Sequence, residues 1–471
     1  MMGLTNVAPQ SITARPIWAR RTGQVALTLV LIGSALLAAV FSQRELIRLG
    51  AQGYVFGYPL VIMDITRANF TEHMAPANHL LQITSFPDEY FRDVVRPNVD
   101  TLYSLAWLDL SGEPLVLDVP ATERYYVLQL LDGWTNVYAS LGPRTSGSHA
   151  GGFLLSGPTW QGEVPVGLTL LRAPTTMAWL IGRLQTNGSA DYTKVRRIQK
   201  QMHLTPLNQW QTGKRTRISV AKPAAQPLRP PVLQMRTLTA TEFFSRLQQL
   251  LQNNPALASD SQALADLGKL GLHPGQPMPA WSAWQTPMIE LGMWLAARKL
   301  QQALEDSQGL HAGWRQPPMH IGRYGQDYGF RAVVAMIGLG ANLADDAVYP
   351  NASQDANGQT LQGGRRYQLH FAAGQLPPVQ AFWSLTAYDQ DGFFIANPVK
   401  RYAIGDRDPL HFNADGSLDI VLQNAAPADT AANWLPIPAS GAFSITGRLY
   451  WPKAEVLNGH WRMPGIQPVA R

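Results

Sequence analysis

The 471-residue sequence contains no cysteine. Disulfide bonds, cysteine nucleophiles, iron–sulfur clusters and thiolate zinc sites are therefore excluded, because each of them needs a cysteine sulfur. The common catalytic signatures are absent too: there is no Gly-x-Ser-x-Gly elbow, no His-Glu-x-x-His, no phosphate-binding glycine loop with Lys-Ser/Thr and no EF-hand loop. The sequence thus indicates neither a metal nor a cofactor. Whether the protein is an enzyme stays open, because catalytic residues from distant parts of a chain leave no linear motif.

Charge is also scarce. Only 15% of the residues are charged, against about a quarter in an average protein. The net charge of +6 is concentrated between residues 194 and 236, where ten lysines and arginines follow Asp191. Nucleic-acid binding would favour aromatic residues among these charges, and only Trp210 lies well inside the segment. No nucleic-acid partner is expected.

The N-terminus predicts export. Arg15, Arg20 and Arg21 precede an apolar run over residues 25–41, which is near the lower length limit for crossing a bilayer. Positive charge before such a run predicts a cytoplasmic N-terminus, here residues 1–24, and an exported remainder. Residues 25–42 then form either a signal anchor or a signal peptide cleaved near Ser42. The first alternative gives a single-pass inner-membrane protein with a periplasmic domain, and the second a periplasmic or secreted protein.

The rest of the chain is rich in turns and short strands, with 40 glycines, 35 prolines and 14 tryptophans. A helix is expected from Leu46 to Phe70, interrupted near Pro59. Short apolar or alternating runs follow from Thr101, helical periodicity covers residues 239–306, and a second strand-rich part follows. We expect a mainly β protein with a helical insert, in which two antiparallel β-sandwich or jelly-roll-like domains are joined by an α-helical segment. The expected boundaries are 43–205, 206–320 and 321–471.

Two groups of motifs resemble known families. RPNVDTLYS, VPATERYYVLQLLDGWTNVYASLGPRTSG and GPTWQG resemble the bacterial domain of unknown function 1254. YGFRAVVAMIGLGANLADDAVYP, LPPVQAFWSLTAYD, DGSLDIVLQ, NWLPIP and RLYWP resemble its usual C-terminal companion, the domain of unknown function 1214. The resemblance runs from about residue 53 to residue 461. It implies a β-rich, two-part envelope or secreted protein with a helical insert, and it implies no established activity.

The stretch VVRPNVDTLYSLAWLDL, residues 94–110, places several polar residues directly before an apolar strand. In the structural interpretation Asn98 forms an Asx-turn, Pro97 holds Arg96 extended, and Asp100 pairs with an arginine, for which Arg124 and Arg144 are the candidates. In the functional interpretation these polar side chains, together with Tyr103, contact a ligand. Arg124 and Arg144 then hold an anionic or sugar-like molecule through bidentate hydrogen bonds.

Two carboxylates, a tryptophan and an arginine are further candidates for chemistry or ligand contact. Asp100 and Asp132 are a candidate acid–base pair if their carboxyl groups face one cleft about 5–9 Å apart. Trp383 either stacks on a sugar ring or fills the core, and core filling is favoured. Arg401, next to Tyr402, is a polar–aromatic candidate for ligand contact.

The favoured function is that of an exported cell-envelope protein with a binding or structural role, holding an unknown small molecule or glycan in a groove between its β domains. The alternative is a carboxylate-dependent hydrolase acting on a glycan, ester or amide. A homo-oligomer is compatible with either.

Overall fold

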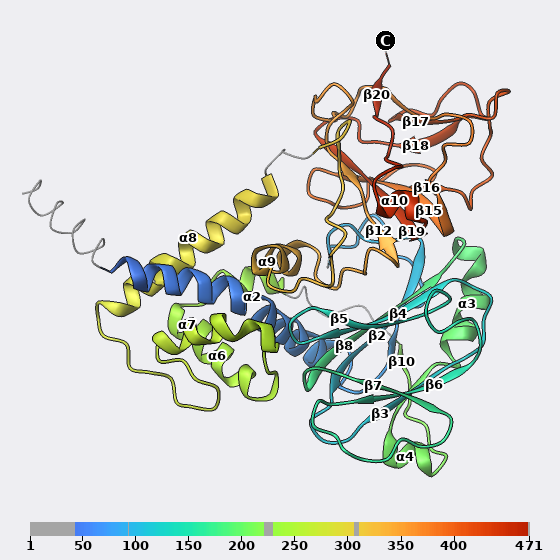
Figure 1. Ribbon diagram of the computed structural model, residues 1–471. Coiled ribbons are helices and arrows are strands. Elements are labelled where there is room, and N and C mark those ends of the chain that lie inside the picture. Colours follow the sequence, from blue (N-terminus) through green and yellow to red (C-terminus); the bar gives the residue numbers. More distant parts are fainter. Residues whose placement is uncertain (1–42, 93, 221–228, 306–309, 470–471) are drawn as a thin grey trace, which may run out of the picture.

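A computed structural model describes residues 43–92, 94–220, 229–305 and 310–469 (Figure 1). The expected cytoplasmic N-terminus and the anchor or signal peptide at residues 25–42 lie outside the described residues. Figure 1 shows five helices, α2, α6, α7, α8 and α9, gathered on one side and the two β regions on the other, the C-terminal one above the N-terminal one.

The central element of the helical part is α2, Arg44–His73. The expected interruption is wrong: Pro59 lies inside one continuous helix. Its missing N–H removes a single backbone hydrogen bond, and the helix is held from outside, because every residue from Tyr58 to Asp64 is buried. By length and composition α2 could cross a membrane, yet 67% of its most apolar window is buried inside the protein. Within the described residues α2 is therefore a core helix.

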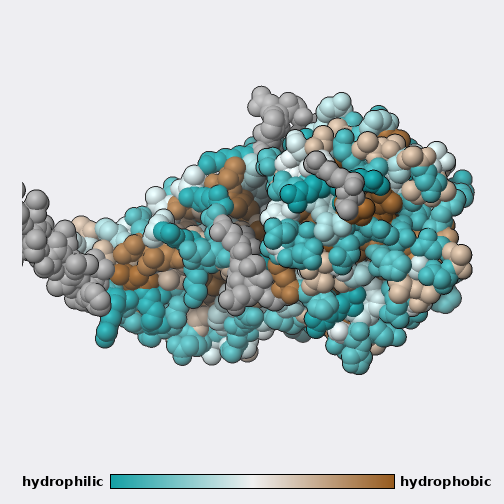
Figure 2. Space-filling view, turned by 90° about the horizontal axis from the view of Figure 1, so that it is seen from above, coloured by the Kyte–Doolittle hydropathy of each residue, from teal (hydrophilic) through white to brown (hydrophobic). Residues whose placement is uncertain are grey.

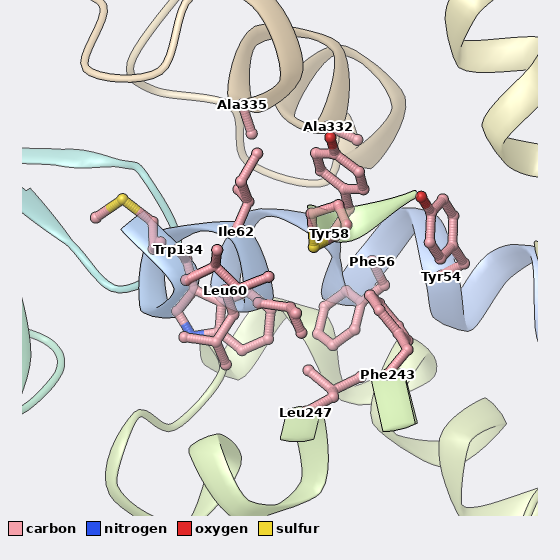
Figure 3. Packing of buried hydrophobic residues seen from close by; sticks show 14 of the residues in the cluster. Tyr54, Phe56, Tyr58, Leu60, Ile62, Trp134, Phe243, Leu247, Ala332 and Ala335 are labelled. Atoms are coloured by element: carbon pink, nitrogen blue, oxygen red, sulfur yellow. The ribbon is translucent and has the colours of Figure 1, made fainter. Parts of the chain in front are cut away.

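Aromatic and aliphatic side chains of α2 pack against helices from later in the chain (Figure 3). Phe243 and Leu247 of α6 lie on one side of α2, and Ala332 and Ala335 of α9 on the other. The helices of the described part, besides α2 and two 3-10 turns, are α3 (Tyr192–Gln199), α4 (Leu207–Gln211), α5 (Pro231–Met235), α6 (Ala240–Asn253), α7 (Ser261–Lys269), α8 (Gln285–Glu305), α9 (Tyr328–Ile337) and α10 (Ala454–Leu457).

The contact between α2 and α8 depends on glycine. A Cβ atom on Gly292 of α8 would lie 2.1 Å from the carbonyl oxygen of Ile47, and one on Gly50 of α2 would lie 2.6 Å from the carbonyl oxygen of Ile289. Both distances are far below van der Waals contact, so any larger residue would push the two backbones apart. Glycine at both positions lets the two helices pack backbone to backbone.

The N-terminal β region contains two sheets. One has the order β10-β1-β2-β8-β4-β5 and the other β7-β6-β3-β9. Buried residues of both sheets belong to one cluster, for example Leu128 and Leu180 from the first and Leu117 and Leu155 from the second. The strands are β1 (Leu81–Gln82), β2 (Thr101–Asp109), β3 (Leu115–Val119), β4 (Tyr126–Asp132), β5 (Val137–Leu141), β6 (Gly151–Ser156), β7 (Leu168–Arg172), β8 (Met177–Gln185), β9 (His203–Pro206) and β10 (Ser219–Val220).

The C-terminal β region also contains two sheets, with the orders β11-β13-β19-β15-β16, where β12 also pairs with β19, and β18-β17-β14-β20. Its longest pairing joins β15 to β19 in antiparallel fashion. The strands are β11 (Trp314–Arg315), β12 (Ala347–Val348), β13 (Asn351–Ala352), β14 (Tyr367–Phe371), β15 (Val379–Asp389), β16 (Ala403–Gly405), β17 (Leu418–Gln423), β18 (Asn433–Pro436), β19 (Phe443–Pro452) and β20 (Gln467–Pro468).

The expected fold class is correct only in part. The two strand-rich regions and the helices between them are present, but helix and strand contribute about equally, because α2 and α9 add to the expected insert. Most strand pairs are antiparallel, whereas β1–β10, β6–β7 and β17–β18 are parallel. The sheets are therefore mixed as well as antiparallel.

Candidate functional site

The loop before β2 lies where the two β regions meet. The side-chain oxygen of Asn98 accepts hydrogen bonds from the backbone N–H groups of Asp100 and Thr101, at 2.6 and 3.0 Å. Its amide nitrogen donates to the hydroxyl of Tyr450 on β19, at 2.8 Å. The predicted Asx-turn is thus confirmed, and the same side chain also ties the N-terminal region to the C-terminal one.

Asp100 is almost completely buried and ion-paired, as the structural interpretation predicts, but its partner is a different arginine. Its carboxylate pairs with the guanidinium of Arg407 and accepts a hydrogen bond from Ser384 Oγ at 2.7 Å. Arg407 also stacks on the ring of Phe382, 4.1 Å from its centroid. The partner lies about 300 residues further along the chain, so the sequence around Asp100 does not reveal it.

The two arginines expected to pair with Asp100 or hold a ligand bind other carboxylates. Arg124 donates two hydrogen bonds to Asp191, at 2.6 and 2.9 Å. Arg144 Nε lies 2.7 Å from a carboxylate oxygen of Asp346. Because both charges are compensated inside the protein, their use as a joint anion clamp is not supported.

Arg96 has a strained backbone. The expectation that Pro97 keeps it extended is wrong, since its φ is +52°, in the left-handed region that few non-glycine residues adopt. Its N–H donates to the carbonyl of Gly392 at 2.8 Å, and its guanidinium donates to the hydroxyls of Thr446 at 2.9 Å and Ser444 at 3.3 Å. These contacts with the C-terminal region hold a conformation that costs on the order of 1–3 kcal/mol, and such strain is found preferentially at functional sites.

A second arginine, Arg183 on β8, is 8% exposed and has neutral partners. Its guanidinium donates to Asn342 Oδ1 at 2.7 Å and to the carbonyl of Gly340 at 3.0 Å. It also lies 5.2 Å from the ring centroid of Tyr103 on β2. Within the described residues, no carboxylate is within ion-pair distance of this guanidinium.

The third arginine, Arg448 on β19, is 5% exposed and has similar surroundings. It donates to Thr386 Oγ1 at 2.7 Å, to the hydroxyl of Tyr388 at 2.5 Å and to the backbone carbonyl of Arg96 at 3.2 Å. The ring of Tyr349 lies 5.9 Å from it. Among the described residues this guanidinium, like that of Arg96, forms no hydrogen bond or ion pair with a carboxylate.

All three arginines line one large open groove of about 2380 Å³, which we call the inter-region groove. Asn98, Tyr103 and Tyr349 line it beside them, and α2, α8 and α9 contribute many of its other lining residues. Two carboxylates of the described residues line the groove, Asp266 and Asp391. Asp266 belongs to the helical end and pairs with Lys269 and Arg48. We call Arg96, Arg183 and Arg448 the arginine cluster.

Tyrosine hydroxyls surround the cluster. Burial raises the pKa of Tyr349, Tyr388 and Tyr450, so these groups stay protonated at neutral pH and can donate hydrogen bonds. Of these three tyrosines Tyr349 lines the groove itself, whereas Tyr388 and Tyr450 are buried behind its wall. Within the part of the chain that the structure describes, no group of three His, Asp or Glu side chains is arranged to hold a metal ion.

The predicted acid–base pair of Asp100 and Asp132 is wrong. Thr101, next to Asp100, pairs with Gln185 of β8, whereas Asp132 pairs with Ala178 at the other end of that strand. Seven residues of strand separate the two positions by roughly 23 Å, at about 3.3 Å per residue. That distance is far beyond the range in which two carboxylates act on one bond.

Asp132 instead closes its own turn. Its carboxylate accepts hydrogen bonds from the backbone N–H groups of Trp134 and Asn136, both at 2.9 Å, and from the side chain of Asn136. Burial raises its pKa to about 6, although these hydrogen bonds act in the opposite direction. The residue is a structural part of the link between β4 and β5.

The remaining candidates lie outside the groove lining. Trp383 is 2% exposed and belongs to the core of the C-terminal region, so the favoured core interpretation is confirmed. Arg401 is partly buried and donates to the carbonyl oxygen of Trp434 at 3.1 Å. Of the predicted ligand-binding residues, Asn98 and Tyr103 line the groove.

Arg183, Tyr349 and Arg448 are not among the site residues predicted from the sequence. A signal for the two arginines exists, because each follows a glycine inside an otherwise apolar strand, in MAWLIGRLQ and FSITGRLYWP. A charged residue in the middle of such a strand is seldom buried unless it has a partner. Neither strand sequence shows that the two arginines meet at the junction of the β regions.

Comparison with solved structures finds a protein of similar fold. No curated protein matches the sequence. The VPA0106 protein from Vibrio parahaemolyticus has a similar crystal structure, with a TM-score of 0.66 and 22% identity over 90% of this chain and 100% of that one. A putative uncharacterized protein from Burkholderia cenocepacia matches at a TM-score of 0.42 and 14% identity, over 94% of this chain and 98% of that one. At these identities the first similarity shows the fold alone.

The family matches cover the two β regions. Residues 77–206 match the protein family of unknown function DUF1254, and residues 346–454 match the protein family of unknown function DUF1214. The first match covers 130 residues and the second 109. The two matches together cover just over half of the chain. The chain thus belongs to the proteins that combine an N-terminal DUF1254 domain with a C-terminal DUF1214 domain.

Proposed function

We propose that this protein is an exported binding protein of the cell envelope, and that its inter-region groove holds a small molecule carrying a carboxylate, phosphate or similar anionic group. One observation carries the proposal: three of the guanidinium groups that line this groove, those of Arg96, Arg183 and Arg448, have neutral hydrogen-bond partners among the described residues. Export rests on the basic residues and the apolar run before residue 42.

The charge balance favours an anionic ligand. Burying a charge without an opposite charge is costly, and Arg183 and Arg448 are both more than nine-tenths buried. Elsewhere in the protein Arg124, Arg144 and Arg407 each have a carboxylate partner, whereas the fully buried Arg331 of α9 lies over aromatic rings and, among the described residues, pairs with no carboxylate. Arg448 is affected by the charge of Asp100, which is paired directly with Arg407. A bound anion would give the arginine cluster a direct partner, through the bidentate geometry that guanidinium groups favour.

The fold supports a site at this place. In the proposal each β region is a two-layer sandwich, and the groove lies where one sheet of each approaches the other. Arg183 comes from the N-terminal region and Arg448 from the C-terminal one. Ligand sites between domains are common, because the two surfaces form a concave shape that neither has alone.

A hydrolase remains the alternative class, but its expected carboxylate pair does not support it. Asp100 is held by Arg407 and Ser384, and Asp132 by its own turn, at opposite ends of β8. The binding function is therefore the better supported of the two.

The proposal is tested by ligand-induced stabilisation. A ligand that binds only the folded protein raises its free energy of unfolding, by about 2.7 kcal/mol at a concentration of 100 Kd. The full chain would be melted in the presence of a panel of carboxylates and phosphate esters, and in the presence of uncharged amides and alcohols of the same shape. We expect anionic members to raise the melting temperature and their neutral counterparts to leave it unchanged.

Arg96→Gln is the test variant, because Arg96 is the most exposed residue of the three. It should lose the stabilisation by anions. Arg323→Gln is the control, since Arg323 is 60% exposed and does not line the groove. Equal stabilisation of the parent and Arg96→Gln, or none by any anion, would refute the proposal.

A further inference from the structure

The inter-region groove is chemically divided. The arginine cluster lies at the junction of the β regions, whereas the walls contributed by the helices are mainly apolar. Six of these lining side chains come from three helices: Val55 and Ile62 of α2, Leu295 of α8, and Val333, Met336 and Ile337 of α9. One groove therefore offers a cluster of guanidinium groups at the junction of the β regions and largely aliphatic helix walls, in which Lys299 of α8 and Asp266 of α7 are the charged side chains.

Several of the apolar side chains that line the groove are more exposed to solvent than side chains of a hydrophobic core. Ile337 is 59% exposed and Leu295 is 44% exposed, and both line the groove. Val94 and Val95, which directly precede Arg96, are 62% and 50% exposed and line it as well. Clustered exposed apolar side chains mark contact sites on soluble surfaces. Figure 2 shows hydrophobic residues at the surface of the helical half.

Size points in the same direction. Pockets for ordinary small ligands measure about 300–1,000 Å³, and this groove measures about 2380 Å³. A small anion such as acetate or phosphate would occupy only its polar end. The apolar surface that continues from Val94 and Val95 to α9 and α8 would then stay in contact with water.

From these observations we infer that the ligand is an anionic amphiphile, with its acidic group on the arginine cluster and an aliphatic chain along α2, α8 and α9. The inference rests on the proposed function and adds the chemical class of the ligand. The arginine cluster sets the orientation, because it places three guanidinium groups at the junction of the β regions, whereas Lys299 and Asp266 are the charged side chains among the helix residues that line the groove. The chain would bury aliphatic surface that is otherwise exposed, which is favourable for each methylene group covered.

The experiment uses the full chain in phosphatidylcholine nanodiscs and a palmitic acid analogue with a photoreactive diazirine in its chain and an alkyne for detection. After irradiation the labelled peptides are identified by mass spectrometry. We expect labels on residues 333–339 and 295–300. Unlabelled palmitate should compete, hexadecanol should not, and shorter acids should compete less, by up to about fourfold per methylene removed.

Two variants separate the ends of the groove. Ile337→Asp places a carboxylate on the apolar wall and should lower labelling about tenfold or more, while stabilisation by short anions stays unchanged. Val166→Asp is its control, because Val166 is fully exposed and lies outside the groove lining. Arg96→Gln should abolish the preference for palmitate over hexadecanol.

The outcomes distinguish this inference from the proposed function. If short anions stabilise the protein but α8 and α9 are not labelled, or hexadecanol competes as well as palmitate, the amphiphile is refuted and the anion site stands. If short anions have no effect and no labelling depends on Arg96, both are refuted. Labelling that Ile337→Asp and Val166→Asp lower equally would also overturn the inference, because the label would then not report on the groove.

Discussion

Replacing Asp100 with asparagine tests whether the junction of the β regions depends on its buried ion pair. Asp100 is 1% exposed, and its carboxylate contacts Arg407 and Ser384. Asparagine keeps the size and one acceptor oxygen but removes the charge, so the guanidinium of Arg407 loses its closest carboxylate. Breaking a buried pair in this way costs about 3–5 kcal/mol.

The lower end of that range applies here. Arg407 keeps its hydrogen bonds to the carbonyl oxygens of Asp100 and Thr186, at 3.3 and 3.1 Å, and its stacking on Phe382. Its side chain is also 17% exposed, so water can partly replace the lost carboxylate. We expect a loss of about 3 kcal/mol, which lowers the melting temperature by about 6–12 °C for a unit of 150–250 residues.

The assay is thermal unfolding followed by circular dichroism. Asp100→Asn and Arg407→Gln should each lower the melting temperature, and the double variant should lose less than the sum, because the two residues share one interaction. Asp345→Asn is the control: its pair with Arg323 is exposed on both sides and is worth about 0.5 kcal/mol or less. If Asp100→Asn is as stable as the parent, or more stable, the architectural role is wrong and Asp100 becomes the first residue to examine for chemistry.

Three further predictions concern other parts of the molecule. Gly292→Val should destabilise the protein by about 1–3 kcal/mol in urea unfolding, because its side chain would overlap the carbonyl of Ile47, whereas Gly112→Ala, with nothing nearby, should be neutral. The pKa of Asp132 is about 6 in the folded state, against an ordinary value of 3.8. Its contribution to the free energy of unfolding is therefore lost as the pH rises from about 4 to 6. Melting curves of Asp132→Asn should therefore fall less over that window than those of the parent, and an equal fall would contradict the assignment. Reporter fusions after residue 50 should be active only in the periplasm, and a fusion active in the cytoplasm would contradict export. Deletion of residues 1–42 should give a soluble protein with an unchanged circular dichroism spectrum. Solubility that depends on detergent would contradict independent folding of the remainder.

The sequence alone determined the features that depend on local periodicity and on neighbouring residues. Alternating apolar runs such as that after Thr101 predicted strands, because side chains of a strand point alternately to two faces. The Asx-turn at Asn98 was predictable, because its partners lie two and three residues away. The dense motifs on either side of the helical part were sufficient to identify both families.

Only the tertiary structure decided which polar groups meet. Asp100 binds Arg407 rather than Arg124, and Arg183 and Arg448 share one groove although they come from strands more than 250 residues apart. Such contacts arise when two sheets and a loop pack together, and no spacing along the chain encodes them. The same holds for Arg96, whose left-handed backbone opposes the local preference before proline and is held by contacts with the other region. Local preferences amount to about 1 kcal/mol per residue, so a few well-placed tertiary contacts are enough to override them.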